Sequence, residues 1–184
     1  NLRHSSNRRR KRFKSPRWPA AANPRLAAEN RPAVIENRKR AGDYERDLIV
    51  GRHHASQLLT IVDRKTKLVK IRKIAKKTAE LVHEQTVKAL KSLPVKSLTN
   101  DNGCEFLNHV HTTKSLGVPV YFTRPYASWE RGTVENTNKL IRQYFPKKTD
   151  FKEIPDEKIQ MVESLLNYRP RKLLGFRSPV ETGA

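Results

Sequence analysis

The pattern of apolar and polar positions after residue 46 predicts a packed domain that opens with three strands. Residues 47–50, 57–62 and 67–72 are short runs rich in β-branched side chains, a composition that favours strands. Polar turns separate them, as at residues 63–66. Three short strands in succession are typical of an antiparallel meander.

Helices and strands alternate in the rest of the chain. Thr78 stands in the N-cap position of a segment whose apolar residues recur at helical spacing, and Pro94 follows its end. Gly117 marks the end of a second helical segment in the same way. The predicted helices are residues 78–93, about 105–116, about 133–145 and about 156–168, and the further predicted strands are residues 95–100 and 118–122.

The predicted order of elements is β-β-β-α-β-α-β-α-α. Strands that are separated by a helix connect through right-handed crossovers, and these place helices on the faces of a sheet. We therefore expect an α/β fold, a mixed five-stranded sheet with helices on both faces. In the helix at 133–145, Ile141, Tyr144 and Phe145 are expected to face the core.

The start of the chain has a different composition. Residues 1–46 hold 14 Lys and Arg against 4 Asp and Glu, and four prolines within residues 15–33 exclude a continuous helix. We expect residues 1–35 to form a flexible basic arm and residues 36–184 to form the core. The arm is either a solvated tail or a segment that orders on DNA phosphates. Its most basic run contains Arg8, Arg9, Arg10, Lys11 and Arg12.

The overall charge points to a polyanionic partner. The 184 residues include 39 Lys and Arg against 18 Asp and Glu, a net charge of +21, and phosphates that bind such a surface release counterions. DNA is the favoured partner, with structured RNA or an anionic membrane surface as alternatives. No apolar run approaches the roughly 18 to 20 residues of a spanning helix. Cys104 is the only cysteine, which excludes an internal disulfide and indicates a reducing compartment.

Three acidic residues stand where a half-buried site can form. Asp47 begins the first predicted strand, Asp101 follows the fourth in the stretch LTNDNGCEF, and Glu135 lies on the helix at 133–145. A crossover helix can make the first and fourth strands neighbours, which would bring the two Asp together. The alternative is that these carboxylates belong to helix caps, turns and the solvated surface.

Clustered carboxylates in a protein interior predict a metal site. They repel one another and resist burial, and a divalent cation removes that penalty. Oxygen ligands that leave room for water and phosphate suit Mg²⁺, or Mn²⁺ as a substitute. Two such ions, about 3.5–4 Å apart, can activate a water or hydroxyl and stabilise the leaving oxygen of a phosphodiester.

Polar and basic residues near Glu135 could hold a DNA backbone. Asn138, Lys139 and Arg142 follow Glu135 at i+3, i+4 and i+7 and share one stripe of the helix. This stripe predicts a groove for DNA, with an ordinary solvated face as the alternative. Arg131, in the loop before the helix, is a further candidate contact to phosphate.

Two more segments have alternative interpretations. Arg169, Arg171 and Lys172 follow the last predicted helix and could either cap its carbonyls or contact DNA. Trp129, in the loop before Glu135, could either contact DNA or pack in the core.

Four stretches of sequence carry a family resemblance. They are RPAVIENRKRAGDYERDLIVG, LTNDNGCEF, YFTRPYASWERGTVENTNKLIRQYFPK and LNYRPRKLLGFRSPVE. Together and in this order they resemble the catalytic core of DDE transposases of the insertion sequence thirty family, which are relatives of retroviral integrases. The resemblance covers the chain from about Arg31 to near its C-terminus.

The resemblance implies a ribonuclease H-like fold and a function. It assigns the catalytic triad to Asp47, Asp101 and Glu135, with the family's usual spacing of 33 residues between the last two. Family members use two divalent metals to hydrolyse a phosphodiester at each transposon end and then direct the 3′-OH at target DNA. They act as oligomers on double-stranded DNA, which would place this chain at the nucleoid of a bacterial cytoplasm.

The chain departs from the family pattern at several positions. Tyr44-Glu45-Arg46 stands where the family commonly has Trp-Glu-Gly, so Arg46 could intrude on the site or point away along the strand. Val134 and Lys139 replace what are often Asn and Gly. Full-length relatives carry an N-terminal helix-turn-helix region, of which this chain has at most the basic arm that follows it. A truncated, inactive remnant that only binds DNA is therefore the alternative function.

Overall fold

A six-stranded mixed sheet forms the centre of the molecule. The computed structural model describes residues 25–52, 56–125 and 127–183. The strand order is β1-β6-β5-β2-β3-β4, and the strands are β1 (Leu26–Ala27), β2 (Asp43–Val50), β3 (Gln57–Asp63), β4 (Val69–Ile74), β5 (Ser97–Asn100) and β6 (Val120–Phe122). The sequence predicted five of them. The sixth, β1, has only two residues, too few to show a strand period.

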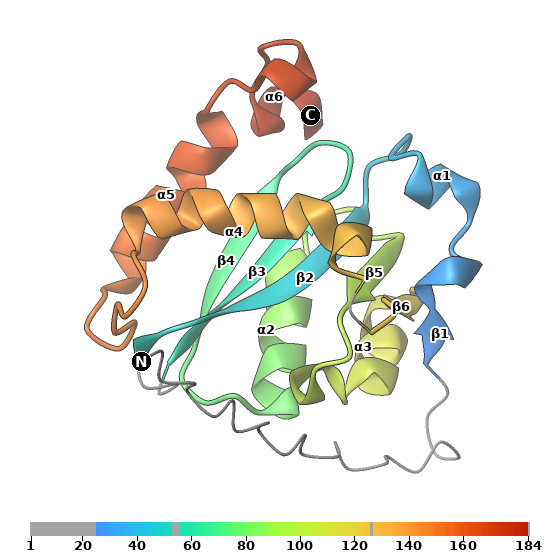
Figure 1. Cartoon of the computed structure of the whole chain (residues 1–184), viewed down its shortest axis with the longest axis horizontal. Helices are drawn as coiled ribbons and strands as arrows, with labels where there is room; N and C mark the ends of the chain where they lie inside the picture. Colours follow the sequence, from blue (N-terminus) through green and yellow to red (C-terminus); the bar gives the residue numbers. More distant parts are fainter. Residues whose placement is uncertain (1–24, 53–55, 126, 184) are drawn as a thin grey trace, which may run out of the picture.

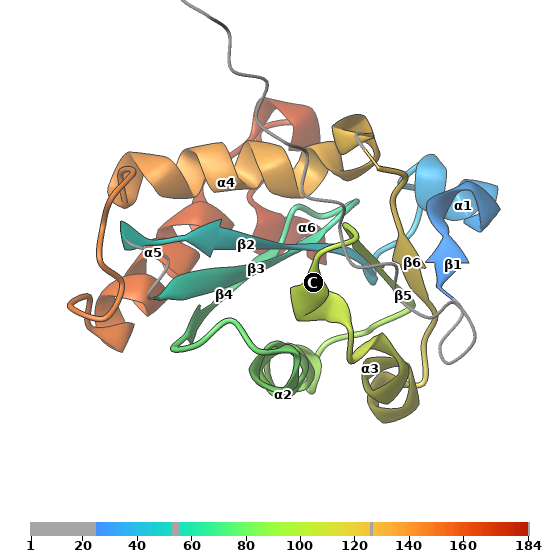
Figure 2. The same ribbon diagram turned by 60° about the horizontal axis from the view of Figure 1, so that its bottom comes forward.

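Helices cover both faces of this sheet (Figure 1). They are α1 (Ala33–Glu36), α2 (Ala79–Leu90), α3 (His109–Leu116), α4 (Gly132–Tyr144), α5 (Asp156–Tyr168) and α6 (Pro179–Gly183), with 3₁₀ turns η1 (Ala28–Asn30), η3 (Cys104–Phe106), η4 (Ser128–Arg131) and η5 (Lys172–Leu174). Figure 2 shows the sheet nearly edge-on, with α4 on one side and α2 and α3 on the other. The α/β layering predicted from the sequence is confirmed.

Pairing of β2 with β5 decides where the acidic residues lie. Strands β2, β3 and β4 form the predicted antiparallel meander, and β5 pairs with β2 in parallel, with Glu45 opposite Thr99. Continued by two residues, this register places Asp47 level with Asp101. The prediction that Asp47 begins its strand is wrong, because β2 starts at Asp43. The first four residues of β2 are buried although three of them are charged. The pattern of apolar residues in the sequence therefore did not show where this strand begins.

Apolar side chains form a core on each face of the sheet. Alternate residues of β3 supply both cores: Leu59 and Ile61 face α2, and Leu58 and Val62 face α4 and α5. Ile141 of α4 and Phe145, which follows its last residue, are buried as predicted, whereas Tyr144 is 38% exposed. The prediction for Tyr144 is wrong because Tyr144 is the last residue of α4, and Phe145, whose backbone leaves the helical conformation (φ −125°, ψ 85°), takes the buried position instead.

The predicted helix boundaries are confirmed where a cap defines them. The Thr78 side chain accepts a hydrogen bond from the Leu81 amide, and Gly117 ends α3 in the left-handed conformation, with φ 67°. Helix α5 spans the predicted residues 156–168. The predicted helix at about 105–116 is instead divided into η3 and α3.

Part of the predicted arm packs on the core. Ala28, Arg31 and Ile35 are buried, and Arg31 Nη1 donates to Thr99 Oγ1 of β5 at 3.2 Å. The basic run Arg8–Arg12 lies outside the described residues, so its role stays a prediction. No helix within the described ranges is long and apolar enough to span a membrane.

Side chains of α5 satisfy the backbone of the outer strand β4. Asn167 accepts from the Val69 amide at 2.8 Å and donates to the Val69 carbonyl at 2.9 Å. Glu163 accepts from the Ile71 amide at 2.7 Å. An outer strand otherwise presents unpaired backbone groups to water or to another chain. These contacts therefore fix α5 to the sheet and protect its edge.

We predict that Asn167→Ala lowers the free energy of unfolding by about 1–3 kcal/mol, because it leaves buried backbone groups of Val69 without partners. Chemical denaturation measures the change. Ser164→Ala, at an exposed position of the same helix, is the control and should change stability little. Equal stability of the two variants would contradict the role assigned to Asn167.

Candidate active site

Asp47 and Asp101 meet at the β2–β5 junction and share one cation. Arg131 Nη1 lies 3.3 Å from Asp47 Oδ1, and Arg131 Nη2 lies 3.4 Å from Asp101 Oδ2. The Asp47 side chain is 23% exposed and that of Asp101 is 35% exposed. Two carboxylates from separate strands thus form one half-buried group, and the guanidinium offsets their repulsion.

The orientation of Asp47 is fixed by a polar contact from α4. Asn138 Nδ2 donates to Asp47 Oδ2 at 2.8 Å, and the Thr60 hydroxyl donates to Asn138 Oδ1 at 2.9 Å. Asn138 was predicted to contact DNA. In the structure its amide connects α4 to the carboxylate of β2, so it acts here as a positioning residue.

Glu135 lies on the same side of α4 as these contacts. Arg131 precedes it by four residues and Asn138 follows it by three, and residues at these spacings share one helix face. Within the residues that the structure describes, however, no group of three His, Cys, Asp or Glu side chains is close enough to hold a metal ion. The structure therefore brings Asp47 and Asp101 together, and Glu135 stays a predicted third ligand.

Glu45 attaches the start of α4 to β2. Its side chain is fully buried, its Oε2 accepts from the Val134 amide at 2.8 Å, and its Oε1 pairs with Arg64 Nη1 at 3.1 Å. A carboxylate at a helix N-terminus also interacts favourably with the helix dipole. The sequence reasoning missed this role, although Glu45 lies two residues before Asp47 and so faces the same side of the strand.

Arg46 does not enter the site. It points to the opposite face of β2, where Nε donates to Asn100 Oδ1 at 2.8 Å and Nη1 donates to Thr86 Oγ1 at 2.9 Å. Its guanidinium also lies over the Phe106 ring, 5.0 Å from the centroid. Complete burial lowers the pKa of Arg46 to about 9. Of the two alternatives, the one in which Arg46 points away is confirmed.

The environment of Asp47 disfavours its negative charge. Burial raises the pKa of Asp47, and the nearby Asp101 raises it further, while Arg131 acts in the opposite direction. In the protein without metal, the ionised Asp47 is therefore destabilised despite the guanidinium beside it.

A cavity of about 310 Å³ opens beside Asp101. It is lined by Asp101, Asn102, Gly103, Thr123, Arg124, Pro125, Ala127 and Arg131. Trp129, in the adjacent η4, is 70% exposed, so the alternative that it packs in the core is wrong. An exposed indole beside this cavity is available to stack on a base.

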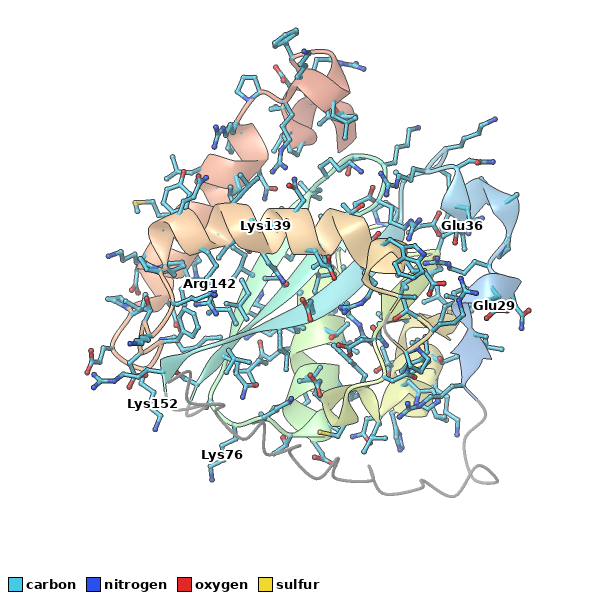
Figure 3. All side chains as sticks on the ribbon, viewed as in Figure 1. Glu29, Glu36, Lys76, Lys139, Arg142 and Lys152 are labelled. Carbon is cyan, nitrogen blue, oxygen red and sulfur yellow. The ribbon has the colours of Figure 1, made fainter. Side chains whose placement is uncertain are left out.

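The other predicted DNA contacts differ in their surroundings. Lys139 is exposed on α4, whereas Arg142 Nη2 donates to the Val50 carbonyl at 2.7 Å and burial lowers its pKa (both labelled in Figure 3). Arg171 Nη2 donates to the Leu166 carbonyl at 3.1 Å, which supports its predicted capping role. Arg169 and Lys172 are exposed, and together with Arg171 they line a second cavity, away from Asp47.

The donor set of this site fits a hard divalent cation. Asp47 and Asp101 offer only oxygen atoms and both are partly exposed. The positively charged guanidinium of Arg131 already lies between them. Mg²⁺ and Mn²⁺ prefer such ligands. Glu135 stays the third member of this set only as a prediction from the sequence.

Comparison with known proteins shows which proteins this chain is similar to. The chain is 45% identical over 159 residues to the transposase of insertion sequence element IS4351 from Bacteroides fragilis, covering 85% of this chain and 49% of that protein. It is 43% identical over 150 residues to the transposase InsI of IS30C from Escherichia coli K12, covering 80% of this chain and 39% of that protein. The chain is a homologue of insertion-sequence transposases. It spans about half or less of the length of these relatives, and no protein-family model matches it.

Solved structures show the fold of this transposase homologue. The catalytic core domain of BIV integrase superposes with a TM-score of 0.60 at 21% identity, covering 77% of this chain and 93% of that one. A chain of the simian T-cell lymphotropic virus intasome, in complex with a PP2A regulatory subunit, gives a TM-score of 0.63 at 19% identity, covering 76% and 52%. The predicted ribonuclease H-like fold is therefore confirmed.

We predict that Asp47→Asn raises the melting temperature of the metal-free protein at neutral pH. Because the pKa of Asp47 is raised on folding, the folded state binds more protons than the unfolded chain between the two pKa values, and stability falls as pH rises through that window. The gain should disappear below the ordinary Asp pKa. Thermal melts in EDTA across pH measure it.

Asp150→Asn is the control for this prediction. The Lys152 amide and the Ser56 hydroxyl donate to Asp150 and lower its pKa, so stability gained above the ordinary Asp pKa is lost as pH falls. The Asn variant should therefore lower the melting temperature at neutral pH. A lower melting temperature for Asp47→Asn as well would contradict the unfavourable environment assigned to Asp47.

We also predict that Arg131→Gln increases the affinity of the DNA-free protein for Mn²⁺ by about 10-fold, equivalent to about 1.4 kcal/mol. The guanidinium pairs with the two Asp that would bind the ion, so its removal ends a competition for the same oxygens. Isothermal titration calorimetry measures the affinity. Arg124→Gln, which removes a cation of the same cavity that pairs with Glu130 instead, should leave the affinity unchanged.

Proposed function

We propose that the chain is the catalytic core of a DNA transposase. In this proposal it performs metal-dependent hydrolysis of a phosphodiester at transposon ends and then transfers the 3′-OH strand to target DNA. The observation that carries the proposal is the meeting of Asp47 and Asp101 on adjacent parallel strands beneath the helix that holds Glu135. The identity of 43% and 45% to insertion-sequence transposases supports the same reaction.

In this proposal Asp47, Asp101 and Glu135 hold two Mg²⁺ or Mn²⁺ ions. Such ions activate the attacking water or 3′-OH and stabilise the leaving oxygen. Asn138 keeps the Asp47 carboxylate in place, and Glu45 holds the start of α4, and with it Glu135, against β2. Arg131 neutralises the two Asp in the metal-free protein and is released toward a DNA phosphate when they bind metal.

The proposed substrate is double-stranded DNA, as transposon ends and as target. The proposed contacts are the cavity beside Asp101 and two exposed residues near it in the sequence, Trp129 of η4 and Lys139 of α4. The basic run Arg8–Arg12 is a further proposed contact. We propose that two or more copies assemble on DNA, at the nucleoid of a bacterial cytoplasm, because transposition joins two ends.

The proposed reaction predicts metal-dependent nicking that needs Asp101. With labelled DNA that carries the ends of its own element, the protein should nick one strand in Mg²⁺ or Mn²⁺. Asp101→Asn should reduce nicking to background, because it removes a charged metal ligand. Gel analysis of the labelled strands measures the product. The control is Asp150→Asn, which removes a carboxylate outside the predicted triad and should leave nicking intact.

The same experiment distinguishes the catalytic proposal from the alternative function. A truncated remnant would bind the labelled DNA without nicking it at any metal concentration, and Asp101→Asn would change nothing. That outcome would overturn the catalytic proposal. This alternative needs a test because the chain covers 49% or less of the length of these two transposases.

A further inference from the structure

A second cavity, of about 530 Å³, lies on the side of α4 away from Asp47. It is lined by Arg38, Lys67, Gly132, Thr133, Asn136, Thr137, Leu140, Arg169, Pro170, Arg171, Lys172 and Leu173. Arg131 and Asn138 face the two Asp, whereas Asn136 and Leu140 lie roughly opposite on the helix, which has 3.6 residues per turn. A ligand in this cavity is therefore separated from the candidate active site by α4.

The lining of this cavity is strongly cationic. Five Lys or Arg residues from three segments of the chain line it, and none of its lining residues is acidic. Elsewhere the basic residues are often paired, as Arg64 is with Glu45 and Lys70 is with Glu163. Within the described part of the chain, none of the five forms an ion pair with a carboxylate. The five are Arg38, Lys67, Arg169, Arg171 and Lys172.

The fold holds Lys67 of this group in place. Arg38 and Lys67 have left-handed backbone conformations, with φ 52° and 64°, which non-glycine residues rarely adopt. Lys67 is buried, and its Nζ donates to the Arg64 carbonyl. Burial, followed by the charge of Arg38, lowers the pKa of Lys67 to about 8. Glu45 and Asp63 raise the pKa of Lys67 but do not offset its burial, so a bound anion would stabilise this buried positive charge.

The wall that α4 contributes is polar. Thr133 is 7% exposed, and its hydroxyl has no hydrogen-bond partner in the described structure. Buried hydroxyls are normally paired. Thr133 lies in the first turn of α4, where the helix dipole favours negative charge. An anionic oxygen in the cavity would give this hydroxyl the acceptor that it lacks.

We propose that this cavity binds backbone phosphates of a DNA segment other than the one at Asp47 and Asp101. The inference rests on the proposed function, because a transposase must hold transposon-end and target DNA at once. One Arg guanidinium can donate two parallel hydrogen bonds to the oxygens of a phosphate. The exposed Leu173 and Pro170 at the cavity supply apolar contact for the sugars.

The test is the salt dependence of DNA binding, measured in EDTA by fluorescence anisotropy with a labelled duplex. Arg169→Gln/Lys172→Gln removes two exposed cations of the cavity. Because each neutralised phosphate contributes about 0.9 to the slope of log K against log salt, the slope should fall by up to about 2. At low salt the number of duplexes bound per chain should also fall from two to one.

The matched control is Lys76→Gln/Lys152→Gln, which removes the same charge at exposed positions away from the cavity (both labelled in Figure 3). It should keep the wild-type slope and stoichiometry. Arg38→Asn, a second cavity variant whose new residue tolerates a positive φ, should lower the slope by about 1. Thermal melts confirm that each variant is folded.

Two results would overturn the inference. The first is a cavity variant whose slope and stoichiometry equal those of the control, the outcome expected if the cavity takes an acidic protein segment instead. The second is a fall in slope with unchanged stoichiometry, which would place both contacts on one DNA segment. Because binding is measured without metal, a protein that fails to nick DNA leaves this test intact, and the two proposals can fail separately.

Discussion

The parallel pairing of β2 with β5 is the interaction on which the rest of the site depends. It is made by three residue pairs, and it sets two carboxylates from distant parts of the chain side by side. Such a group is unstable alone, because burial and mutual repulsion both oppose its charge. A cation must therefore accompany it. In the metal-free protein that cation is Arg131, and in the proposed reaction it is the metal.

Helix α4 lies between the pair of Asp residues and the second cavity. One side of it contacts Asp47 through Asn138, its start is held by Glu45, and its far side lines a cationic cavity. The position of the helix is thus determined by buried polar contacts as well as by Ile141 and Phe145 in the core. Under the two proposals, a chain of net charge +21 has two separate regions that bind phosphate, on opposite sides of one helix.

Sequence reasoning succeeded where the signal was local. The cap at Thr78, the left-handed Gly117 and the bounds of α5 all follow from a few adjacent residues. It failed where distant residues decide the outcome. Tyr144 is exposed because the core stripe of α4 is set by the sheet beneath it, and the start of β2 was missed because its charged residues are buried against partners such as Arg40 and Arg64.

The sequence by itself determined the order of the five longer strands and of the helices α2 to α5, the excess of positive charge and the three acidic candidates, because period, composition and residue type can be read along the chain. Only the tertiary structure decided that Arg46 faces away from the site, that Arg131 pairs with both Asp, and that Arg38 and Lys67 join three cations from beyond α5. The physical reason is that the direction of a side chain and the identity of its partner depend on the packing of segments that are far apart in the chain.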